Sequence, residues 1–527
     1  MKKIILLAAV TTSLLMLAIP VILFSNKRTQ KLSSIKTTEQ FTAYFQQANA
    51  LHEKGDYAQA IPFYAQAIKI NPAIAQVYYN LGLTFQKLNM PVDAIKMYKQ
   101  TIKINPDYTN AYFQSAEILK KHKQHAQAVA LIDTHLKTNP LQKESLLMKA
   151  SIWYDQGKLE QACILCKDIV KQNPSYSEAY TMLGNIYEKL NDIPHAIDAH
   201  KKAVGLAPDN PLAHTALADG YLALGDYQNW GKEYEWRWRM KTFKKRVAPL
   251  WDGSDLKNKK ILFITENGLG DTLQYIRFLP KLKHQGAQIT VLAQKPLAKL
   301  LATFSCIDTL ITDASQIPPV DFMSSVRSLP VYCAAPVKNC GETPYLQANP
   351  ALIAHWKVPL STDKKFKIGL CWQASTIDAQ SIPQSRRTIP FETIAQLADI
   401  KNISLYSLQK NWPIEQLEKY GIKNFDPDFD EKNGAFMDTA AIMKNLDLII
   451  TVDTVTAHLA GALNVPVWML TPLAADPRWM LNRSDTPWYP SMILFRQKKV
   501  SDWDSVIKTV KTSLEKKVNK ILTQNNT

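Results

Sequence analysis

The chain has 527 residues, of which 46% are hydrophobic and 21% are charged, and it contains only 17 glycines. These values exclude a disordered, collagen-like or low-complexity chain, and the length predicts two or three domains. The net charge of +17 favours an acidic partner, such as phospholipid, nucleic acid or a phosphate-bearing substrate, without choosing among them.

The N-terminus has a basic start followed by an uncharged, mostly apolar run over residues 4–24. A transmembrane helix needs about 20 such residues, so we predict an uncleaved membrane anchor within residues 1–30. A cleaved signal peptide is the alternative. The anchor predicts a single-pass protein of a bacterial inner membrane. The positive-inside rule slightly favours a cytosolic location for the rest of the chain.

A pattern with a period of 34 residues occupies residues 38–240. It consists of prolines, each preceded twelve residues earlier by an alanine: Pro72, Pro106, Pro140, Pro174 and Pro208, with Ala60, Ala94, Ala128, Ala162 and Ala196. A small residue lets two helices approach closely, and a proline ends the second helix. The pattern resembles the tetratricopeptide repeat, with about five repeats and a degenerate sixth. Residues 230–238 are rich in aromatics and are expected to pack against the next domain.

Such helix pairs stack into an all-α solenoid with a concave groove. The groove predicts binding of a protein or glycan acceptor, and a simple spacer is the alternative.

An α/β pattern begins after Trp251. A strand over residues 259–265, a loop with Gly268 and Gly270, a helix from Asp271 to Phe278 and a strand over residues 289–292 form a βαβ unit. This unit predicts a parallel sheet in a first α/β half, residues 255–360. Glycines let a ligand approach the backbone, and a helix start offers free N–H groups. A turn simply capped by Asp271 is the alternative.

A second α/β half is predicted over residues 361–500. Its strands are expected at residues 366–372, 403–408, 446–452 and 466–470, with a helix at 455–463. Ligands of open parallel sheets bind at the carboxyl ends of the strands. Across both halves, the residues predicted at such ends are Asp271, Trp372, Gln409, Lys410, Asp453 and Thr454.

Residues 255–500 resemble the glycosyltransferase family that includes bacterial lipopolysaccharide heptosyltransferases, glycosyltransferase family 9. The matching stretches are residues 268–280, 369–372, 386–390, 407–410, 453–462, 487–490 and 495–497. The resemblance implies a GT-B fold, which is a pair of Rossmann-like halves with a cleft between them. It further implies inverting, metal-independent transfer from a nucleotide-sugar donor, with no cofactor.

The resemblance also implies roles for single residues. Asp271 matches the candidate general base, and His458 completes the predicted catalytic pair. The predicted donor-binding residues are Gly268, Gly270, Trp372, Arg387, Gln409, Lys410, Asp453 and Thr454. Among them, Lys410 and Arg387 would neutralise the leaving diphosphate in place of a metal.

Two positions depart from the family pattern, since Val455 stands where glycine is expected and Arg387 where lysine is expected. These departures leave the donor sugar open. An ordinary helix N-cap is the alternative for Asp453 and Thr454, and a core histidine is the alternative for His458.

Residues 501–527 predict a C-terminal helix with apolar residues at four-residue spacing. We expect this helix to cross back onto the first α/β half, and a membrane-surface helix is the alternative.

Taken together, the sequence predicts a membrane-anchored glycosyltransferase whose repeats bind an acceptor or partner protein. A non-catalytic repeat scaffold with a degenerate glycosyltransferase-like domain is the alternative. No recognised nucleic-acid-binding module accompanies the positive charge.

Overall fold

The computed structural model describes residues 27–243, 246–266, 268–333, 343–374, 387–425 and 429–525. The predicted membrane anchor at residues 4–24 lies outside the described residues. Within the described ranges, no helix combines the length and the apolar character that crossing a bilayer requires. The chain divides into two compact units, Met1–Gln156 and Gly157–Thr527.

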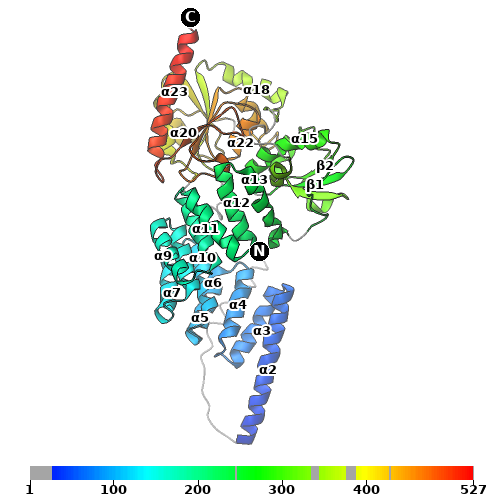
Figure 1. The fold of residues 1–527 in the computed structure, drawn as a ribbon, viewed down its shortest axis with the longest axis vertical. Helices are drawn as coiled ribbons and strands as arrows, with labels where there is room; N and C mark the ends of the chain where they lie inside the picture. The colour runs from blue at the N-terminus through cyan, green and yellow to red at the C-terminus, as the bar shows by residue number, and fades with distance from the viewer. Residues whose placement is uncertain are drawn as a thin grey trace. The chain divides into compact units, whose positions relative to one another are not determined.

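The first unit is a stack of helix pairs (Figure 1). Its helices are α2 (Lys27–Lys54), α3 (Tyr57–Ile70), α4 (Ala75–Lys87), α5 (Pro91–Ile104), α6 (Thr109–Lys121), α7 (His125–Thr138) and α8 (Lys143–Asp155). The recurring alanines Ala60, Ala94 and Ala128 are fully buried, so neighbouring helices approach closely. Gly82 works in the same way, because a side chain there would overlap the ring of Tyr98. The predicted solenoid is confirmed.

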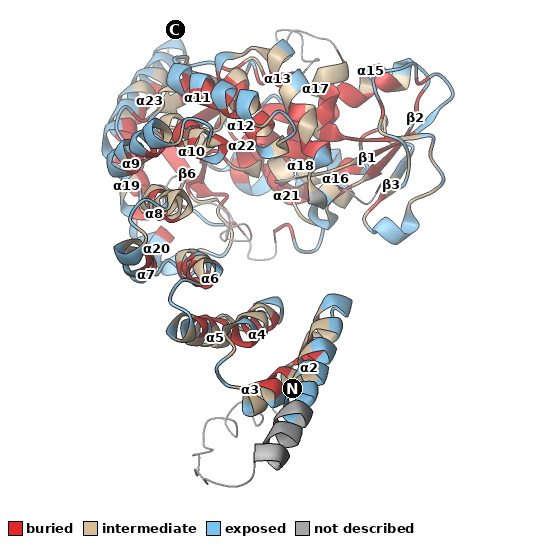
Figure 2. Cartoon of the chain, turned by 60° about the horizontal axis from the view of Figure 1, so that its bottom comes forward, coloured by how far each residue is buried: buried red, intermediate tan, exposed pale blue. Residues whose placement is uncertain are grey.

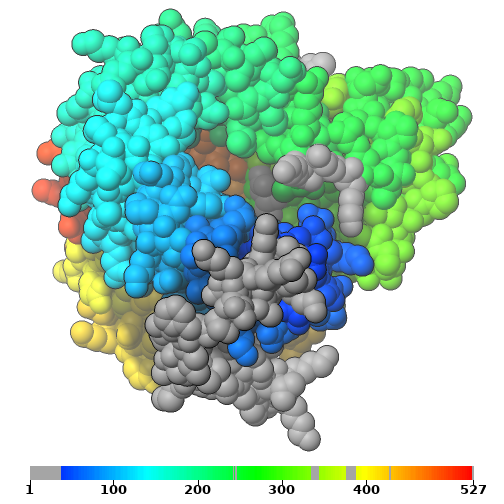
Figure 3. Space-filling view, turned by 90° about the horizontal axis from the view of Figure 1, so that it is seen from below, coloured from blue at the N-terminus to red at the C-terminus, as the bar shows by residue number. Residues whose placement is uncertain are grey.

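The second unit opens with further helix pairs. After α9 (Leu159–Gln172), they are α10 (Ser177–Lys189) with α11 (Ile193–Leu206) and α12 (Pro211–Leu224) with α13 (Tyr227–Tyr234). The short 3₁₀ helices η1 (Glu235–Arg239) and η2 (Lys241–Phe243) follow. The aromatic stretch packs against the first sheet, where Trp238 clusters with Leu262 and Met323. Figure 3 shows the green atoms of these helices and of the first α/β half as one continuous surface.

The first sheet has four parallel strands in the order β3-β2-β1-β4. Its strands are β1 (Lys260–Ile264), β2 (Gln288–Leu292), β3 (Thr309–Ile311) and β4 (Phe322–Ser325). Its helices are α14 (Leu269–Tyr275), η3 (Ile276–Phe278), α15 (Leu279–His284), η4 (Lys295–Leu297), α16 (Ala298–Leu301), η5 (Ala314–Gln316), η6 (Val326–Ser328) and α17 (Leu329–Tyr332). The predicted parallel βαβ unit is therefore present, although the expected helix from Asp271 to Phe278 starts earlier and ends in a 3₁₀ turn.

The second sheet has five parallel strands in the order β6-β5-β7-β8-β9. Its strands are β5 (Phe366–Cys371), β6 (Ile403–Ser407), β7 (Leu448–Val452), β8 (Val467–Thr471) and β9 (Met492–Arg496). Its helices are α18 (Pro350–Ser361), α19 (Phe391–Ala395), η9 (Gln396–Asp399), α20 (Ile414–Lys419), α21 (Met437–Met443), α22 (Val455–Ala462), η10 (Pro477–Trp479) and α23 (Trp503–Asn525).

Helices cover both faces of the second sheet. Alternate residues of a strand point to opposite faces, so Leu448 and Ile450 join one buried cluster while Ile449 joins another. The first cluster lies under α19, α20 and α23, and the second lies under α18, α21 and α22. Figure 2 shows the buried residues concentrated in the strands and on the inner sides of these helices.

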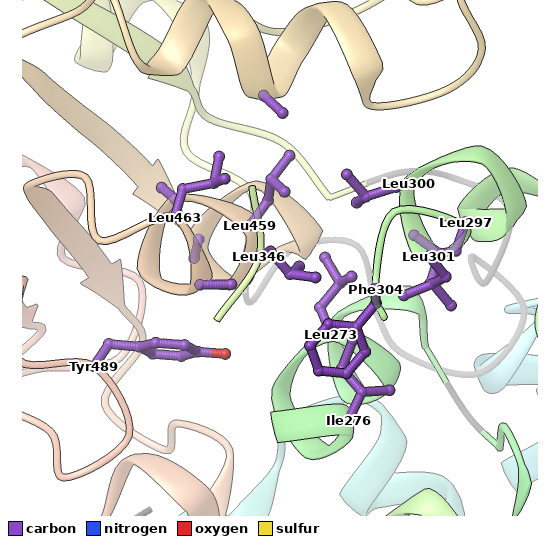
Figure 4. Close-up of a cluster of buried hydrophobic side chains, with 14 of the residues drawn as sticks. Leu273, Ile276, Leu297, Leu300, Leu301, Phe304, Leu346, Leu459, Leu463 and Tyr489 are labelled. Atoms are coloured by element: carbon purple, nitrogen blue, oxygen red, sulfur yellow. The ribbon is translucent and has the colours of Figure 1, made fainter. Parts of the chain in front are cut away.

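The second cluster also joins the two sheets into one core. Leu273 and Ile276 follow β1, Leu459 and Leu463 follow β7, and all four belong to the same buried cluster. Figure 4 shows these residues within one group of apolar side chains, with the ring of Tyr489 pointing toward the group. The two α/β halves therefore pack directly on one another through these apolar side chains.

The C-terminal helix corrects one expectation. Instead of crossing to the first half, α23 packs on α19, η9 and β9 of the second half. Its apolar stripe is buried against the second sheet through Val506, Val510, Leu514 and Val518. The stripe was predicted correctly, but the surface that it covers lies on its own half.

Candidate functional site

The candidate site lies where α14 and α22 meet. Each helix starts at the carboxyl end of a central strand, α14 after β1 and α22 after β7. Gly270 allows the close approach, because a side chain there would overlap the ring of His458. The ring of His458, from the second half, thus occupies the space beside Gly270 of the first half. Gly270 therefore serves the packing of α14 on α22.

Asp271 is buried at this contact and links the two halves. One carboxylate oxygen, Oδ2, accepts the Gly268 N–H at 3.0 Å and caps the helix. The other, Oδ1, lies 2.8 Å from Nη2 of Arg478 and 3.8 Å from Nε of Arg327. Burial opposes ionisation, but the charges of Arg478 and Arg327 outweigh it and lower the pKa of Asp271. The carboxylate is therefore held ionised, as a general base must be.

His458 is a buried, neutral side chain. Its Nδ1 lies 2.9 Å from the hydroxyl of Tyr489, and its Nε2 lies 3.9 Å from Oδ1 of Asp453. Burial, helped by the charge of Arg478, lowers its pKa to about 3. At neutral pH this imidazole can accept or relay a hydrogen bond, but it carries no proton to donate as an imidazolium. In this structure it fits the alternative of a satisfied core histidine.

Asp453 follows β7 directly and begins the short link to α22, where it lies among charged groups. Nη1 of Arg387 is 3.8 Å from its Oδ2 and 3.4 Å from its main-chain carbonyl oxygen. Burial raises the pKa of Asp453, and the nearby charge of Asp476 raises it further. Asp476 itself forms an ion pair with Arg478, whose charge lowers the pKa of that carboxyl despite its burial.

The other predicted donor-binding residues are not all at this cluster. Thr454 is the N-cap residue of α22 without a side-chain capping bond, and it is partly exposed. Gln409 accepts the Gln373 N–H at 3.0 Å, and Lys410 forms an ion pair with Glu431. Trp372 is buried between Phe391 and Trp412 in the core, so its indole presents no face to a ligand in this structure.

Sequence reasoning missed the arginines that dominate the electrostatics of the site. Arg327 follows β4, and Arg478 lies on η10 in the loop that follows β8. Both positions obey the rule that polar residues gather after parallel strands, so a search for arginines after every strand would have found them. Asp476, two residues before Arg478, could have been found in the same way.

The site has hydrogen-bonding capacity left over within the described residues. Nε of Arg327 has no acceptor there, and no donor reaches Oδ1 of Asp271 with hydrogen-bond geometry. Leaving a buried polar group unsatisfied costs about 1–3 kcal/mol. The two unsatisfied atoms carry opposite charges and lie 3.8 Å apart.

Comparison with known proteins identifies the helical part. The TPR repeat matches residues 48–89, and the tetratricopeptide repeat matches residues 75–108, 113–177 and 177–210. The helix pairs within these ranges are tetratricopeptide repeats. In other proteins such repeats are protein-interaction modules, which is the scaffold role that they suggest here.

Similar proteins include solved repeat structures and one curated relative. YrrB, described as having an unusual peptide-binding site, is 20% identical and covers 34% of this chain and 94% of its own, with a TM-score of 0.28. The pilF protein of Pseudomonas aeruginosa is 14% identical, covers 39% and 94%, and has a TM-score of 0.32. Protein FlbA of Caulobacter vibrioides is 26% identical over 294 residues, 50% of this chain and 48% of FlbA. The chain thus spans about half the length of this curated relative.

Proposed function

We propose that this protein is a glycosyltransferase of GT-B architecture that takes a nucleotide-sugar donor and needs neither metal nor cofactor. The support is a pair of parallel sheets whose carboxyl ends meet at one charged cluster. The observation that carries the proposal is the ion pair between Asp271 of the first half and Arg478 of the second, at 2.8 Å. A candidate base and a candidate phosphate-binding cation thereby meet across the two halves.

In this proposal Asp271 takes the proton from the attacking acceptor hydroxyl. An unactivated hydroxyl is a poor nucleophile, so its proton must leave as the bond to the sugar forms. Displacement of Arg478 from Asp271 by an incoming diphosphate would free the carboxylate oxygen that it now contacts. Binding of the donor would thus prepare the base.

The leaving diphosphate is placed at the start of α22, beside Thr454 and Arg387. Free N–H groups at a helix start and a nearby guanidinium both favour a phosphate group. Arg387 is partly exposed, with 32% of its side chain accessible, so a ligand can reach it. Arg327 and Arg478 would supply further positive charge as the diphosphate departs.

The tetratricopeptide repeats are proposed to bind the acceptor or a partner protein. The anchor at residues 4–24 would hold the protein at a bacterial inner membrane, with the α/β part on the cytosolic side. This location gives access to nucleotide sugars, which are mainly cytosolic. A reporter fused after Thr527 that localises outside the cytosol would contradict this part of the proposal.

The test is a thermal-shift panel on the full chain with UDP, GDP, ADP and CMP and with the common sugar nucleotides. A ligand at 100 times its dissociation constant stabilises the folded state by about 2.7 kcal/mol, which is easily detected. We expect one nucleotide class to raise the melting temperature, and we expect Arg387→Met to abolish that shift. Arg483→Met, a change at an ion pair with 31% exposure of the arginine, is the matched control.

A non-catalytic scaffold is the second candidate function. It is favoured by the ring of His458, which fills the space above Gly270 where a donor loop would be open, and by the enclosed indole of Trp372. Sugar transfer that disappears in a folded Asp271→Asn variant would exclude it. Absence of any nucleotide-induced shift would instead favour the scaffold, and partner proteins of the repeats would become the target.

A further inference from the structure

The last helices of the repeat array pack against the segment that carries Arg327. Helix α13 ends at Tyr234, and η1, which follows it, carries Arg237. Both side chains are buried. Helix α13 contacts α17, which directly follows the 3₁₀ helix η6 and its Arg327. The ring of Tyr234 lies in an apolar cluster against which Val331 of α17 packs. The end of the array is thus part of the interior of the first α/β half.

Arg237 joins two segments of that half. Its Nη2 lies 2.9 Å from Oε1 of Glu266, in the loop after β1, and donates to the hydroxyl of Ser328 on η6 at 2.6 Å. The hydroxyl of Ser325 donates to the same oxygen of Glu266 and accepts the Arg327 N–H at 3.1 Å. The two segments joined in this way are the one that leads to the candidate base and the one that carries Arg327. A buried arginine of the repeats therefore fixes the backbone on both sides of the candidate site.

The ring of Tyr234 supports the Arg327 side chain. The central carbon of the Arg327 guanidinium lies over the ring, 5.0 Å from its centroid, and that of Arg237 lies over the same ring at 4.0 Å. The electron-rich face of an aromatic ring attracts a cation within about 6 Å of its centroid. Nε of Arg327 donates no hydrogen bond in the described part of the chain, so the ring face is a contact that can set the direction of this guanidinium.

The supported guanidinium faces the candidate base. Nε of Arg327 lies 3.8 Å from Oδ1 of Asp271, and Nη2 of Arg478 lies 2.8 Å from the same oxygen. One guanidinium from each α/β half thus meets one carboxylate oxygen. The attraction between opposite charges weakens as they separate, so Arg327 affects this site only while its position is held.

We propose that Tyr234 is a positioning residue of the candidate site, whose ring holds Arg327 beside Asp271 and directs it toward a bound diphosphate. The end of the repeat array would then complete the anion site as well as joining the repeats to the α/β part. The inference rests on the proposed function in assigning the diphosphate to a sugar nucleotide. The ring and the two guanidinium groups over it are properties of this chain alone.

The electronic character of the ring separates positioning from simple packing. Fluorine atoms withdraw electrons from a ring, so they weaken its attraction for a cation while changing its size little. A ring that only fills space tolerates fluorination without a change in anion affinity. A ring that holds Arg327 by attraction loses affinity with each added fluorine. Because Arg237 lies over the same ring, the effect must also disappear when Arg327 is replaced.

The experiment measures binding of inorganic pyrophosphate and of the common sugar nucleotides to the full chain by calorimetry. We expect Tyr234→Phe to bind pyrophosphate within about twofold of the unmodified protein, and Tyr234→Leu to bind it about tenfold more weakly. Phenylalanine carrying one, two or three fluorine atoms at position 234 should weaken binding stepwise, by about fivefold at the end of the series. Arg327→Met should weaken it about tenfold, and Tyr234→Leu should then add less than about twofold.

The matched control is Tyr187→Leu. It removes another ring of the repeats that lies near a cation, with Nζ of Lys167 at 5.7 Å from the ring centroid. We expect this variant to leave pyrophosphate affinity unchanged. Melting temperatures show whether each variant folds. The fluorinated rings keep the shape of the side chain, so they keep the test valid if Tyr234→Leu does not fold.

The outcomes distinguish the two proposals. Unchanged affinity across the fluorinated series, or a loss that persists undiminished with Arg327→Met, overturns the positioning role and leaves the proposed function standing. Pyrophosphate binding that falls with fluorination, without binding of any sugar nucleotide, supports the positioning role and removes the glycosyltransferase proposal. If only a sugar nucleotide binds, the same series is measured with that nucleotide and the same criteria apply. If the unmodified protein binds neither ligand, there is no anion site to position and both proposals fail.

Discussion

Two sets of repeats with the same period have different interiors. In the first unit, the hydroxyl of Tyr98 donates to Oε1 of Gln86 at 2.8 Å. At the same two repeat positions of the second unit, 102 residues later in the sequence, Nε2 of His200 lies 3.2 Å from Oε1 of Glu188. The same two repeat positions thus hold a tyrosine and a glutamine in the early repeat, and a histidine and a glutamate in the late repeat.

The difference matches what each set packs against. The early pair belongs to a cluster of repeat helices. The late pair lies in α10 and α11, which pack on α12, and α12 in turn packs on η10 of the second α/β half. The 34-residue pattern specifies the packing of helices, and the residues between the pattern positions adapt a repeat to its surroundings. Substitutions can separate helix packing from local adaptation, and the buried charges of the second unit provide the first test.

The largest expected loss of stability comes from removing a buried charge in the second unit. Arg478→Met leaves Asp271 and Asp476 without their closest cation, and breaking a buried ion pair typically costs about 3–5 kcal/mol. Arg483→Met removes an arginine of the same loop whose partner, Asp485, is 71% exposed, and should cost about 1 kcal/mol or less. Hydrogen exchange in β7 and α22 measures the difference. Equal losses in both variants would show that the cluster does not stabilise the fold.

Acidification provides the second test, through His458. Its pKa in the folded protein is about 3, below the usual 6.5, so the unfolded chain binds more protons between these pH values. Stability therefore rises with pH through this window and falls on acidification, by about 1.4 kcal/mol per pH unit. Between pH 6.5 and pH 4, the second unit should lose about 3 kcal/mol more in the unmodified protein than in His458→Gln. Parallel pH profiles for the two proteins would mean that His458 is accessible and charged.

The third test asks whether helix packing is equivalent in the two sets of repeats. Gly82→Ala would push a methyl group into Tyr98, and Gly184→Ala would push one into His200. Overpacking of this kind costs about 1–3 kcal/mol, and we expect similar losses at the two sites. Gly205→Ala is the control, because no atom lies near its added methyl group, and alanine should stabilise that helix by up to about 1 kcal/mol. Hydrogen exchange in α4–α5 and in α10–α11 reads each site separately, and a loss at only one site would contradict the equivalence.

Local patterns predicted most of the elements, because periodicity is a local property of a sequence. In β5 and the residue after it, Ile368, Leu370 and Trp372 point to one face of the sheet and Cys371 points to the other. That alternation places Trp372 in the core and not at a ligand. The helix pairs were predicted well for the same reason, because the alanines and prolines recur at fixed spacing.

Contacts between distant segments could not be predicted in this way. The surface under α23 and the pairing of Asp271 with Arg478 depend on how separate elements assemble, and no local spacing records either of them. The contacts that join the last repeat helices to both α/β halves, between Leu481 and Ala223 and between Arg237 and Ser328, also required the three-dimensional structure. The predicted residues do lie after the strands, but the structure brings only some of them together, and whether they form a site stays a prediction.

The smallest expected effect on stability comes from Glu188→Gln, which gives the late repeat the side chain of the early one. The amide oxygen can still pair with Nε2 of His200, so the free energy of unfolding should change by no more than about 0.5 kcal/mol. The charge beside Asp219 is removed, however, and because Glu188 helps to raise the pKa of Asp219, that pKa should fall below about 7. An NMR titration of the Asp219 carboxyl group should show this fall, while Glu178→Gln, at the start of the same helix, leaves the titration in place. If the titration does not move, the charge of Glu188 does not act on Asp219, and the difference between the two repeats has another cause.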